Sequence, residues 1–207
     1  MDDAASPIHW ASHVLTPETA SPQGAPMLRV EALCRSFGDT PAVHDVSFSV
    51  PQGAVTCLLG PSGCGKSTTL RMIAGIEQPD SGSVRIGNRV MSDAATFLPP
   101  ERRGIGLVFQ DFALFPHLDV AANIGFGLRG KITPQRIALI RALAPKPCLL
   151  LMDEPFSSLD HRLRDGVRDA TLDLLRDSGT TVLMVTHDPE EAMLMGDRIA
   201  VMRRGRL

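Results

Sequence analysis

The sequence predicts an α/β fold, in which helices flank a largely parallel sheet and a small antiparallel β layer lies beside it. Strand-length apolar segments alternate along the chain with segments of helical periodicity, which is typical of a parallel sheet. Two of the apolar segments, Cys148–Met152 and Val182–Thr186, have no polar face, as expected for strands that are covered on both sides. A glycine-rich turn also joins the apolar segment Ala54–Leu59 to a helical segment.

The antiparallel layer is predicted from the first segments of the chain. Strands are expected over Leu28–Leu33 and Val43–Val50, joined by the turn-rich segment Ser36–Pro41. A further strand, Ser83–Ile86, follows the turn Pro79–Gly82. These three strands are expected to lie beside the parallel sheet.

The parallel sheet and its helices are predicted from the remaining segments. The expected strands are Ala54–Leu59, Ile105–Phe109, Cys148–Met152, Val182–Thr186 and Ile199–Met202. The expected helices are Thr68–Ala74, Pro134–Leu143, Leu163–Leu175 and Pro189–Met195. Strands and helices therefore alternate over most of the chain.

The composition indicates one folded domain preceded by a tail. The first 26 of the 207 residues are rich in Pro, Ser and Ala and lack Lys and Arg, so residues 1–26 are expected to be disordered and residues 27–207 to fold. This start has no features of a signal peptide, and no apolar run has the length of a membrane span. The net charge of −2, with both signs spread along the chain, argues against a nucleic-acid partner.

The most informative segment is Gly60–Ser67, with the sequence GPSGCGKS, which fits the phosphate-binding pattern G-x-x-x-x-G-K-[ST]. Glycines let the backbone wrap closely, so that successive N–H groups and the start of a helix point at one phosphate chain. Lys66 then reaches the β- and γ-phosphates of a nucleotide, and the Ser67 hydroxyl is a ligand for Mg²⁺. The predicted nucleotide contacts are Gly60, Pro61, Ser62, Gly63, Cys64, Gly65, Lys66, Ser67 and Thr68. The fold class is therefore that of a P-loop NTPase core, the alternative being a glycine-rich turn with a surface lysine.

Polar residues that follow three predicted strands complete this site. Asp153 and Glu154 follow a buried strand, at the sheet edge where α/β folds bind their ligands. Asp153 is placed to hold Mg²⁺ through water, and Glu154 to act as general base on the water that attacks the γ-phosphate. His187 is suited to contact the γ-phosphate, and Gln110 to sense water or Mg²⁺. The alternative is a structural role, in which the acidic pair caps the next segment and His187 and Gln110 take no part in chemistry.

With these motifs the chain resembles the nucleotide-binding subunit of ABC transporters, from about Met27 to Leu207. The resemblance is carried by GPSGCGKST (Gly60–Thr68), VFQDFALFPHL (Val108–Leu118), LLLMDEPFSSLD (Leu149–Asp160) and VTHDPEEA (Val185–Ala192). It implies that Phe37 stacks on adenine and that Gln110 senses Mg²⁺ and faces the membrane subunit. It further implies that Asp160 reaches the partner protomer and that His187 is the switch histidine.

The segments LPPERRGIGLVFQDFALFPHL and NIGFGL look most like those of ferric iron importers, and they are also similar to those of polyamine, thiamine and sugar importers. The resemblance therefore implies an ATPase that uses ATP and Mg²⁺ and is peripheral on the cytoplasmic face of the cell membrane. Its implied partners are a second ATP-binding subunit, a membrane permease and a solute-binding protein. A soluble ATPase of DNA maintenance is an alternative, against which the stretch FALFPHLDVAANIGFGL argues because it resembles the membrane-facing loop of importers.

The chain departs from the family at the signature LSGGQ, which is absent. The run Gly130-Lys131-Ile132-Thr133 occupies its place, and the interval from Gln110 to Asp153 is much shorter than in the family. We therefore expect most of the helical subdomain to be deleted around residues 129–133. In this family two subunits pair head to tail, so that each ATP lies between one phosphate loop and the partner's signature. Two functions remain open, an ATP-hydrolysing importer subunit and a nucleotide-binding but hydrolysis-impaired regulatory or heterodimer partner.

Overall fold

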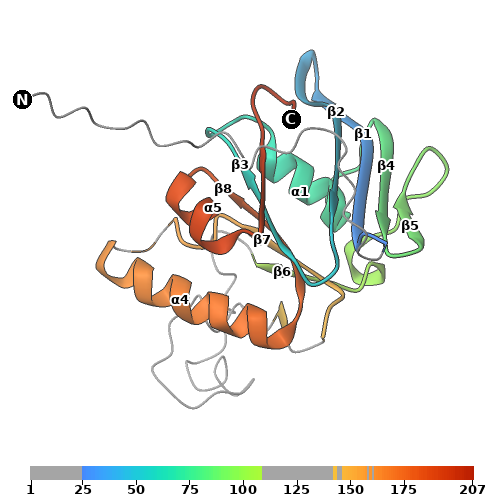
Figure 1. Cartoon of the computed structure of the whole chain (residues 1–207). Helices are drawn as coiled ribbons and strands as arrows, with labels where there is room; N and C mark the ends of the chain where they lie inside the picture. The colour runs from blue at the N-terminus through green and yellow to red at the C-terminus, as the bar shows by residue number, and fades with distance from the viewer. Residues whose placement is uncertain (1–24, 109–141, 144–145, 158, 160) are drawn as a thin grey trace, which may run out of the picture.

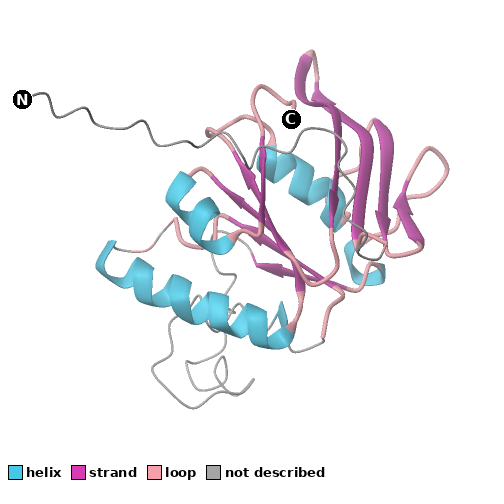
Figure 2. Cartoon of the chain, in the orientation of Figure 1, coloured by secondary structure: helices cyan, strands magenta, loops and turns pink. Residues whose placement is uncertain are grey.

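The structure is a computed structural model, and it describes residues 25–108, 142–143, 146–157, 159 and 161–207. These residues form two β-sheets, and helix α1 (Lys66–Ala74) lies between them (Figure 1). Helices α4 (His161–Ser178) and α5 (Pro189–Met195) cover the other face of the larger sheet (Figure 2). The result is a layered α/β domain, as the sequence predicts.

The smaller sheet is antiparallel, with four strands in the order β2-β1-β4-β5. Its strands are β1 (Leu28–Phe37), β2 (Thr40–Val50), β4 (Ser81–Ile86) and β5 (Arg89–Ser92). Phe37 pairs with Thr40, so the turn is shorter than the predicted Ser36–Pro41. The polar residues near this turn pair through their backbones, which a hydrophobic pattern does not report. Strand β5 was not predicted, because it has only 4 residues and no apolar alternation of useful length.

The larger sheet is parallel, with five strands in the order β6-β7-β8-β3-β9. Its strands are β3 (Val55–Leu59), β6 (Ile105–Val108), β7 (Leu149–Asp153), β8 (Thr181–Thr186) and β9 (Arg198–Val201), with a short 3₁₀ turn, Pro100–Arg102, before β6. These bounds confirm the predicted strands to within one residue at each end. Because all five strands are parallel, their carboxyl ends lie at one edge of the sheet.

Strands β7 and β8 are buried along their whole length because both faces of the sheet are covered. In β7, Leu149 and Leu151 pack into the core that contains α1, whereas Leu150 and Met152 pack into the core beneath α4 and α5. Successive side chains of a strand point to opposite faces, so an all-apolar strand serves two cores at once.

The helices agree with the prediction in position and differ in length. α5 has the predicted bounds, α1 begins before the predicted Thr68, and α4 extends beyond Leu163–Leu175 at both ends. Of the predicted helix Pro134–Leu143, only Ala142 and Leu143 are described, and both are helical. The predicted tail up to residue 24 and the predicted deletion around residues 129–133 lie outside the described residues.

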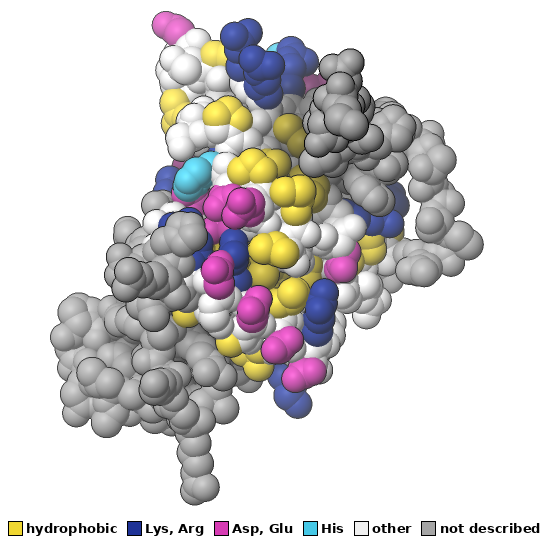
Figure 3. Space-filling model, turned by 60° about the vertical axis from the view of Figure 1, so that its left-hand side comes forward, with side chains coloured by type: hydrophobic (Ala, Val, Ile, Leu, Met, Phe, Trp, Pro, Cys, Tyr) yellow, Lys and Arg dark blue, Asp and Glu magenta, His cyan; other side chains and the backbone are white. Residues whose placement is uncertain are grey.

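The described surface carries charges of both signs. On the face shown in Figure 3, hydrophobic side chains lie in the middle of the described part, acidic side chains lie among and below them, and a group of basic side chains lies at the top. Within the part of the chain that the structure describes, no helix has the length and apolar character needed to cross a membrane.

Candidate nucleotide-binding site

The loop between β3 and α1 makes a tight turn at the carboxyl edge of the larger sheet. Gly63 and Gly65 have φ angles of 76° and 105°, in the region that favours glycine. A Cβ atom on Gly60 would lie 2.2 Å from the carbonyl oxygen of Met202, and one on Gly65 would lie 2.4 Å from the carbonyl oxygen of Ala42. Two backbone segments therefore press against this loop, and only glycine fits at either point.

The backbone of this loop is arranged to receive an anion. Among the described residues, the N–H groups of Gly63 and Gly65 donate to no acceptor in a backbone or side chain. Left-handed residues within a turn direct successive N–H groups toward one point, which forms a concave anion site. The first turn of α1 follows directly and contains no acidic residue, so its free N–H groups add to this positive potential.

Lys66 places a buried positive charge in the loop. Its side chain is only 4% exposed. Its Nζ atom donates to the carbonyl oxygens of Gly60 at 2.8 Å and Pro61 at 3.1 Å. The same atom lies 4.0 Å from Oε1 of Glu154, so the predicted phosphate ligand and the predicted general base are neighbours.

Two of the three predicted magnesium residues, Ser67 and Asp153, are in direct contact; the third, Gln110, lies outside the described residues. The Ser67 hydroxyl donates to Oδ1 of Asp153 at 2.9 Å. Burial raises the pKa of Asp153, and the hydrogen bond from Ser67 opposes this rise. Mg²⁺ is usually held by one or two protein oxygens together with water and substrate phosphates, and this pair fits that requirement. In the described part of the chain there is no group of three or more His, Cys, Asp or Glu residues that could hold a metal ion.

The predicted base and the predicted switch histidine also come together. Oε2 of Glu154 lies 3.0 Å from Nδ1 of His187. Glu154 has a φ angle of 44°, which a residue with a side chain adopts only at a cost of about 1–2 kcal/mol. Its N–H donates to the carbonyl oxygen of Val185 at 3.0 Å, and its own carbonyl accepts from the Ser157 hydroxyl at 3.0 Å. These contacts hold the strained residue in place at the end of β7.

Residues that the sequence reasoning missed hold the segment with His187. The Thr186 hydroxyl donates to Oε2 of the buried Glu191 at 2.7 Å and accepts from the N–H of Asp188 at 3.0 Å. Burial raises the pKa of Glu191, while its hydrogen bond with Thr186 lowers it. The hydrophobic pattern gives no sign of such a contact, because Glu191 reads as a polar residue in the first turn of a helix.

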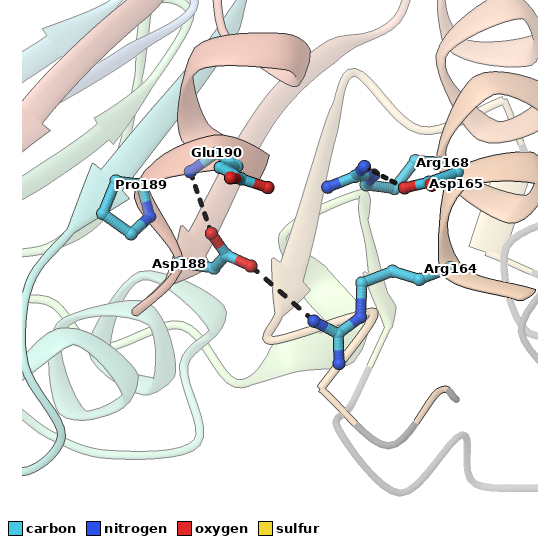
Figure 4. A pocket seen from close by; sticks show the side chains of 6 residues that line it. All are labelled: Arg164, Asp165, Arg168, Asp188, Pro189 and Glu190. Carbon is cyan, nitrogen blue, oxygen red and sulfur yellow. Dashed lines mark hydrogen bonds and ion pairs between the residues drawn. The ribbon is translucent and has the colours of Figure 1, made fainter. Parts of the chain in front are cut away.

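Asp188 ties this segment to α4. One carboxylate oxygen accepts from the N–H of Glu190 at 2.8 Å and so caps α5, and the other lies 3.7 Å from Nη1 of Arg164 (Figure 4). A hollow of about 640 Å³ opens between the two helices. It is lined by Arg164, Asp165, Arg168, Asp188, Pro189 and Glu190. The hollow is therefore lined by residues that directly follow His187 and by none of the phosphate-loop residues.

The other predicted residues divide into those that the structure describes and those that it does not. Phe37 lies at the β1–β2 turn with 51% of its surface exposed. Cys64 is buried in the core next to Gly60, so it contributes to the loop through its backbone. Gln110 and Asp160 lie outside the described residues.

These features define the class of the domain. A glycine-rich loop between a strand and a helix, at the carboxyl edge of a parallel sheet and next to a Ser–Asp pair, is the site of a P-loop NTPase. The sequence profile of a family described as ABC transporter matches residues 43–134. Over this region the chain is similar to the ABC transporter family, and over a longer span it is similar to importer ATP-binding proteins, as its motifs predict.

Three relatives illustrate the relationship. The chain is 46% identical over 211 residues to the Fe(3+) ions import ATP-binding protein FbpC of Pseudomonas fluorescens, covering 87% of this chain and 60% of that protein. It is 44% identical to the sulfate/thiosulfate import ATP-binding protein CysA 2 of Chromobacterium violaceum, covering 87% of this chain and 57% of that protein. It is 41% identical to the spermidine/putrescine import ATP-binding protein PotA of Rubrobacter xylanophilus, covering 91% and 58%. The chain thus spans well under two thirds of the length of these relatives.

Solved structures agree with the fold. The dimeric structure of MJ0796, a bacterial ABC transporter cassette, superposes with a TM-score of 0.71 at 27% identity, over 87% of this chain and 96% of that one. A second structure of the same cassette, in a post-hydrolysis state bound to ADP and Pi, also has a TM-score of 0.71, at 26% identity. The layered α/β domain is therefore the fold of an ABC ATPase cassette.

Proposed function

We propose that this chain is an ATP-binding subunit of an ABC importer, which binds Mg-ATP at the β3–α1 loop and couples its hydrolysis to solute uptake. The observation that carries the proposal is the contact between Ser67 and Asp153 beside the buried Lys66. This contact joins the phosphate loop to the acidic strand end, and both are needed for a nucleotide held with a divalent cation. Ferric iron is the first cargo to test, because a relative at 46% identity is a ferric iron import subunit.

Each residue has a distinct role in this proposal. Lys66 and the loop N–H groups bind the phosphates, while Ser67 and Asp153 hold Mg²⁺, which neutralises phosphate charge when it is bound. Glu154 accepts a proton from the attacking water, and His187 orients the Glu154 carboxylate from 3.0 Å away. Phe37 stacks on the adenine base. Gln110 and Asp160 keep the roles that the resemblance implies, in sensing Mg²⁺ and in reaching the partner protomer.

The first experiment separates binding from hydrolysis. Titration calorimetry with Mg-ATP is expected to show saturable binding to the purified chain, and Ser67→Ala to weaken it. Glu154→Gln is expected to bind Mg-ATP as the wild type does. When each is paired with a subunit that carries the signature, Glu154→Gln is expected to hydrolyse ATP 10²- to 10⁴-fold more slowly than the wild type at its own site, because only the base is lost. Glu101→Gln, an exposed carboxylate outside the site, is the matched control. Failure of the wild type to bind Mg-ATP would overturn the proposal.

The importer role implies partners at the membrane. We propose a second ATP-binding subunit, an integral permease and a solute-binding protein, with the chain peripheral on the cytoplasmic face of the membrane. The names of the relatives support import, and the dimeric state of the MJ0796 cassette supports pairing of two subunits. Co-purification of the tagged chain with a membrane permease is the expected result, and recovery with nucleic acid instead would contradict it.

The absent signature shapes this proposal. No LSGGQ occurs in the 207 residues. The alignment with the ferric iron relative extends over 211 positions although it covers only 87% of this 207-residue chain, so the relative has residues without a counterpart here. The alignment does not give the position of these residues, but their number agrees with the deletion that we expect around residues 129–133. We propose that a partner subunit supplies the signature. The names of the relatives favour an importer subunit over an impaired regulator.

A further inference from the structure

Arg35 contacts the ring of Phe37, the predicted adenine platform. It precedes Phe37 by two residues on β1, and its guanidinium carbon lies 5.1 Å from the centroid of the Phe37 ring. This distance is within the range of a cation–π contact. The ring itself remains half exposed, so its free surface is open to a ligand.

Two carboxylates fix the guanidinium of Arg35. Nη1 donates to Oδ1 of Asp80 at 2.6 Å, and Nη2 donates to Oε1 of Glu77. The Arg35 side chain is 24% exposed, so these ion pairs are partly shielded from water. Because two negative charges offset the one positive charge, Arg35 offers little net charge to a ligand. Its effect on the site is therefore one of position.

Glu77 and Asp80 also connect the β1–β2 turn to helix α1. Asp80 accepts the N–H of Ser36 at 2.7 Å through Oδ2, and its own N–H donates to the carbonyl oxygen of Cys34 at 2.9 Å. The Ser36 N–H and the Arg35 guanidinium hold the pKa of Asp80 below its ordinary value. The N–H of Glu77 donates to the carbonyl oxygen of Arg71 in the last turn of α1, at 3.2 Å. The segment after α1, which contains Glu77 and Asp80, is thus hydrogen-bonded to the end of β1 next to Phe37.

We propose that Arg35 is a positioning residue, which holds the ring of Phe37 in the orientation that stacks on the purine base of the nucleotide. This inference rests on the proposed ATP-binding function. An exposed aromatic ring that is fixed before binding loses less freedom when the base stacks on it, so the base binds more tightly. Arg35 covers one side of the ring and leaves the other to the base. Glu77 and Asp80 hold the guanidinium in this position, so that it does not turn away into solvent.

The test compares a ligand that has a base with one that has none. Affinities of the full chain for Mg-ATP and for Mg-tripolyphosphate are measured by titration calorimetry. Arg35→Met keeps the aliphatic part of the side chain and is expected to weaken ATP binding about five- to tenfold while leaving tripolyphosphate binding unchanged. Arg29→Met is the matched control, since Arg29 is an exposed arginine on the same strand and should alter neither affinity.

A double-mutant cycle separates positioning from a general effect on folding. Phe37→Ala alone is expected to weaken ATP binding, and Arg35→Met is expected to add nothing further in the Phe37→Ala background. If Arg35→Met fails to fold, Glu77→Gln replaces it, because this change loosens the guanidinium and keeps the arginine. Glu77→Gln is expected to produce a smaller loss of ATP affinity of the same selective kind.

The outcomes that overturn the inference differ from those that overturn the proposed function. Equal losses for ATP and tripolyphosphate, unchanged ATP affinity, or full additivity with Phe37→Ala would each show that Arg35 does not act through the ring. A wild-type chain that binds neither ligand would overturn ATP binding itself, and the role of Arg35 with it. A wild type that binds both ligands equally well would show that the base makes no contact, which also excludes positioning by Arg35.

Discussion

Lys66 is the residue on which we expect nucleotide affinity to depend most. Its ammonium is buried and is already aligned by the carbonyl oxygens of Gly60 and Pro61, so it is expected to meet the phosphates without further ordering. A charge-assisted hydrogen bond of this kind contributes about 1.5–3 kcal/mol, which corresponds to about a 10- to 100-fold change in affinity. Lys66→Met is expected to raise the dissociation constant for Mg-ATP by that factor in titration calorimetry. Arg102→Met, at an exposed site, should leave it unchanged.

Asp153 makes stability depend on pH in a direction opposite to that of most carboxylates. Burial raises its pKa above the ordinary value of 3.8, so the folded chain keeps this proton to higher pH than the unfolded chain does. The protonated Asp153 therefore contributes its full stabilisation of the folded chain at low pH, and this stabilisation is lost as the pH rises through the raised pKa of Asp153. Asp153→Asn removes this loss, so the nucleotide-free variant is expected to melt at a higher temperature than the wild type at pH 7.

The difference between the melting temperatures of Asp153→Asn and the wild type should shrink as the pH falls below 3.8. At such pH, Asp153 is mostly protonated in both the folded and the unfolded wild-type chain. Differential scanning calorimetry across this pH range measures it. Asp169→Asn, on an exposed position of α4, is the control and should show no such pH-dependent gain. An Asp153→Asn variant that melts lower than the wild type at pH 7 would contradict the argument, since it would mean that the carboxylate stabilises the nucleotide-free fold.

At the scale of an element, α1 is held at its carboxyl end by one buried arginine. Arg103 donates to the carbonyl oxygens of Met72 at 3.0 Å, Ile73 at 2.8 Å and Leu98 at 2.7 Å, and it is 1% exposed. Burial lowers its pKa to about 10, so the cation is retained at neutral pH. The arginine thus satisfies carbonyl groups that the end of a helix otherwise leaves without donors.

Arg103→Met is expected to lower the free energy of unfolding by about 3 kcal/mol, because buried carbonyl groups lose their donors. Urea denaturation of the full chain measures the change. Arg102→Met, one residue earlier and exposed, is the matched control and should cost less than about 0.5 kcal/mol. Equal stabilities for the two variants would show that the helix end finds other donors.

The elements that were predictable are those in which pattern and burial agree. β7 and β8 were predicted to within one residue because every position is buried. The closeness of Ser67 to Asp153 and of Glu154 to His187 was expected because these residues follow strands that end at one edge of the sheet. The Arg35–Asp80 and Arg103–Met72 contacts could not be predicted. They join polar side chains to partners far along the chain, and hydrophobic periodicity carries no information about which distant group a polar residue meets.

At the scale of the whole molecule, the sequence limits what the chain does alone. In the proposed head-to-tail pair the phosphate loop is expected to supply one side of the site, and no LSGGQ occurs in the sequence to supply the other. The purified chain is therefore expected to bind Mg-ATP and to hydrolyse it slowly, since donors on the far side of the γ-phosphate are missing. Adding an importer subunit that carries the signature should raise the rate in a phosphate-release assay. Rapid turnover by the purified chain alone would contradict this prediction.

The position of β3 in the middle of the larger sheet has a consequence for synthesis on the ribosome. Val55 pairs with Val182 on one side and Thr56 pairs with Arg198 on the other, so β3 emerges long before either neighbour exists. The loop after it is closed by Met202, whose N–H donates to the carbonyl oxygen of Leu59 at 2.7 Å. Contacts of such long sequence separation form slowly, and unpaired strands aggregate. The nascent chain therefore needs protection until β8 and β9 have been made, and ATP is expected to stabilise the fold only after that point.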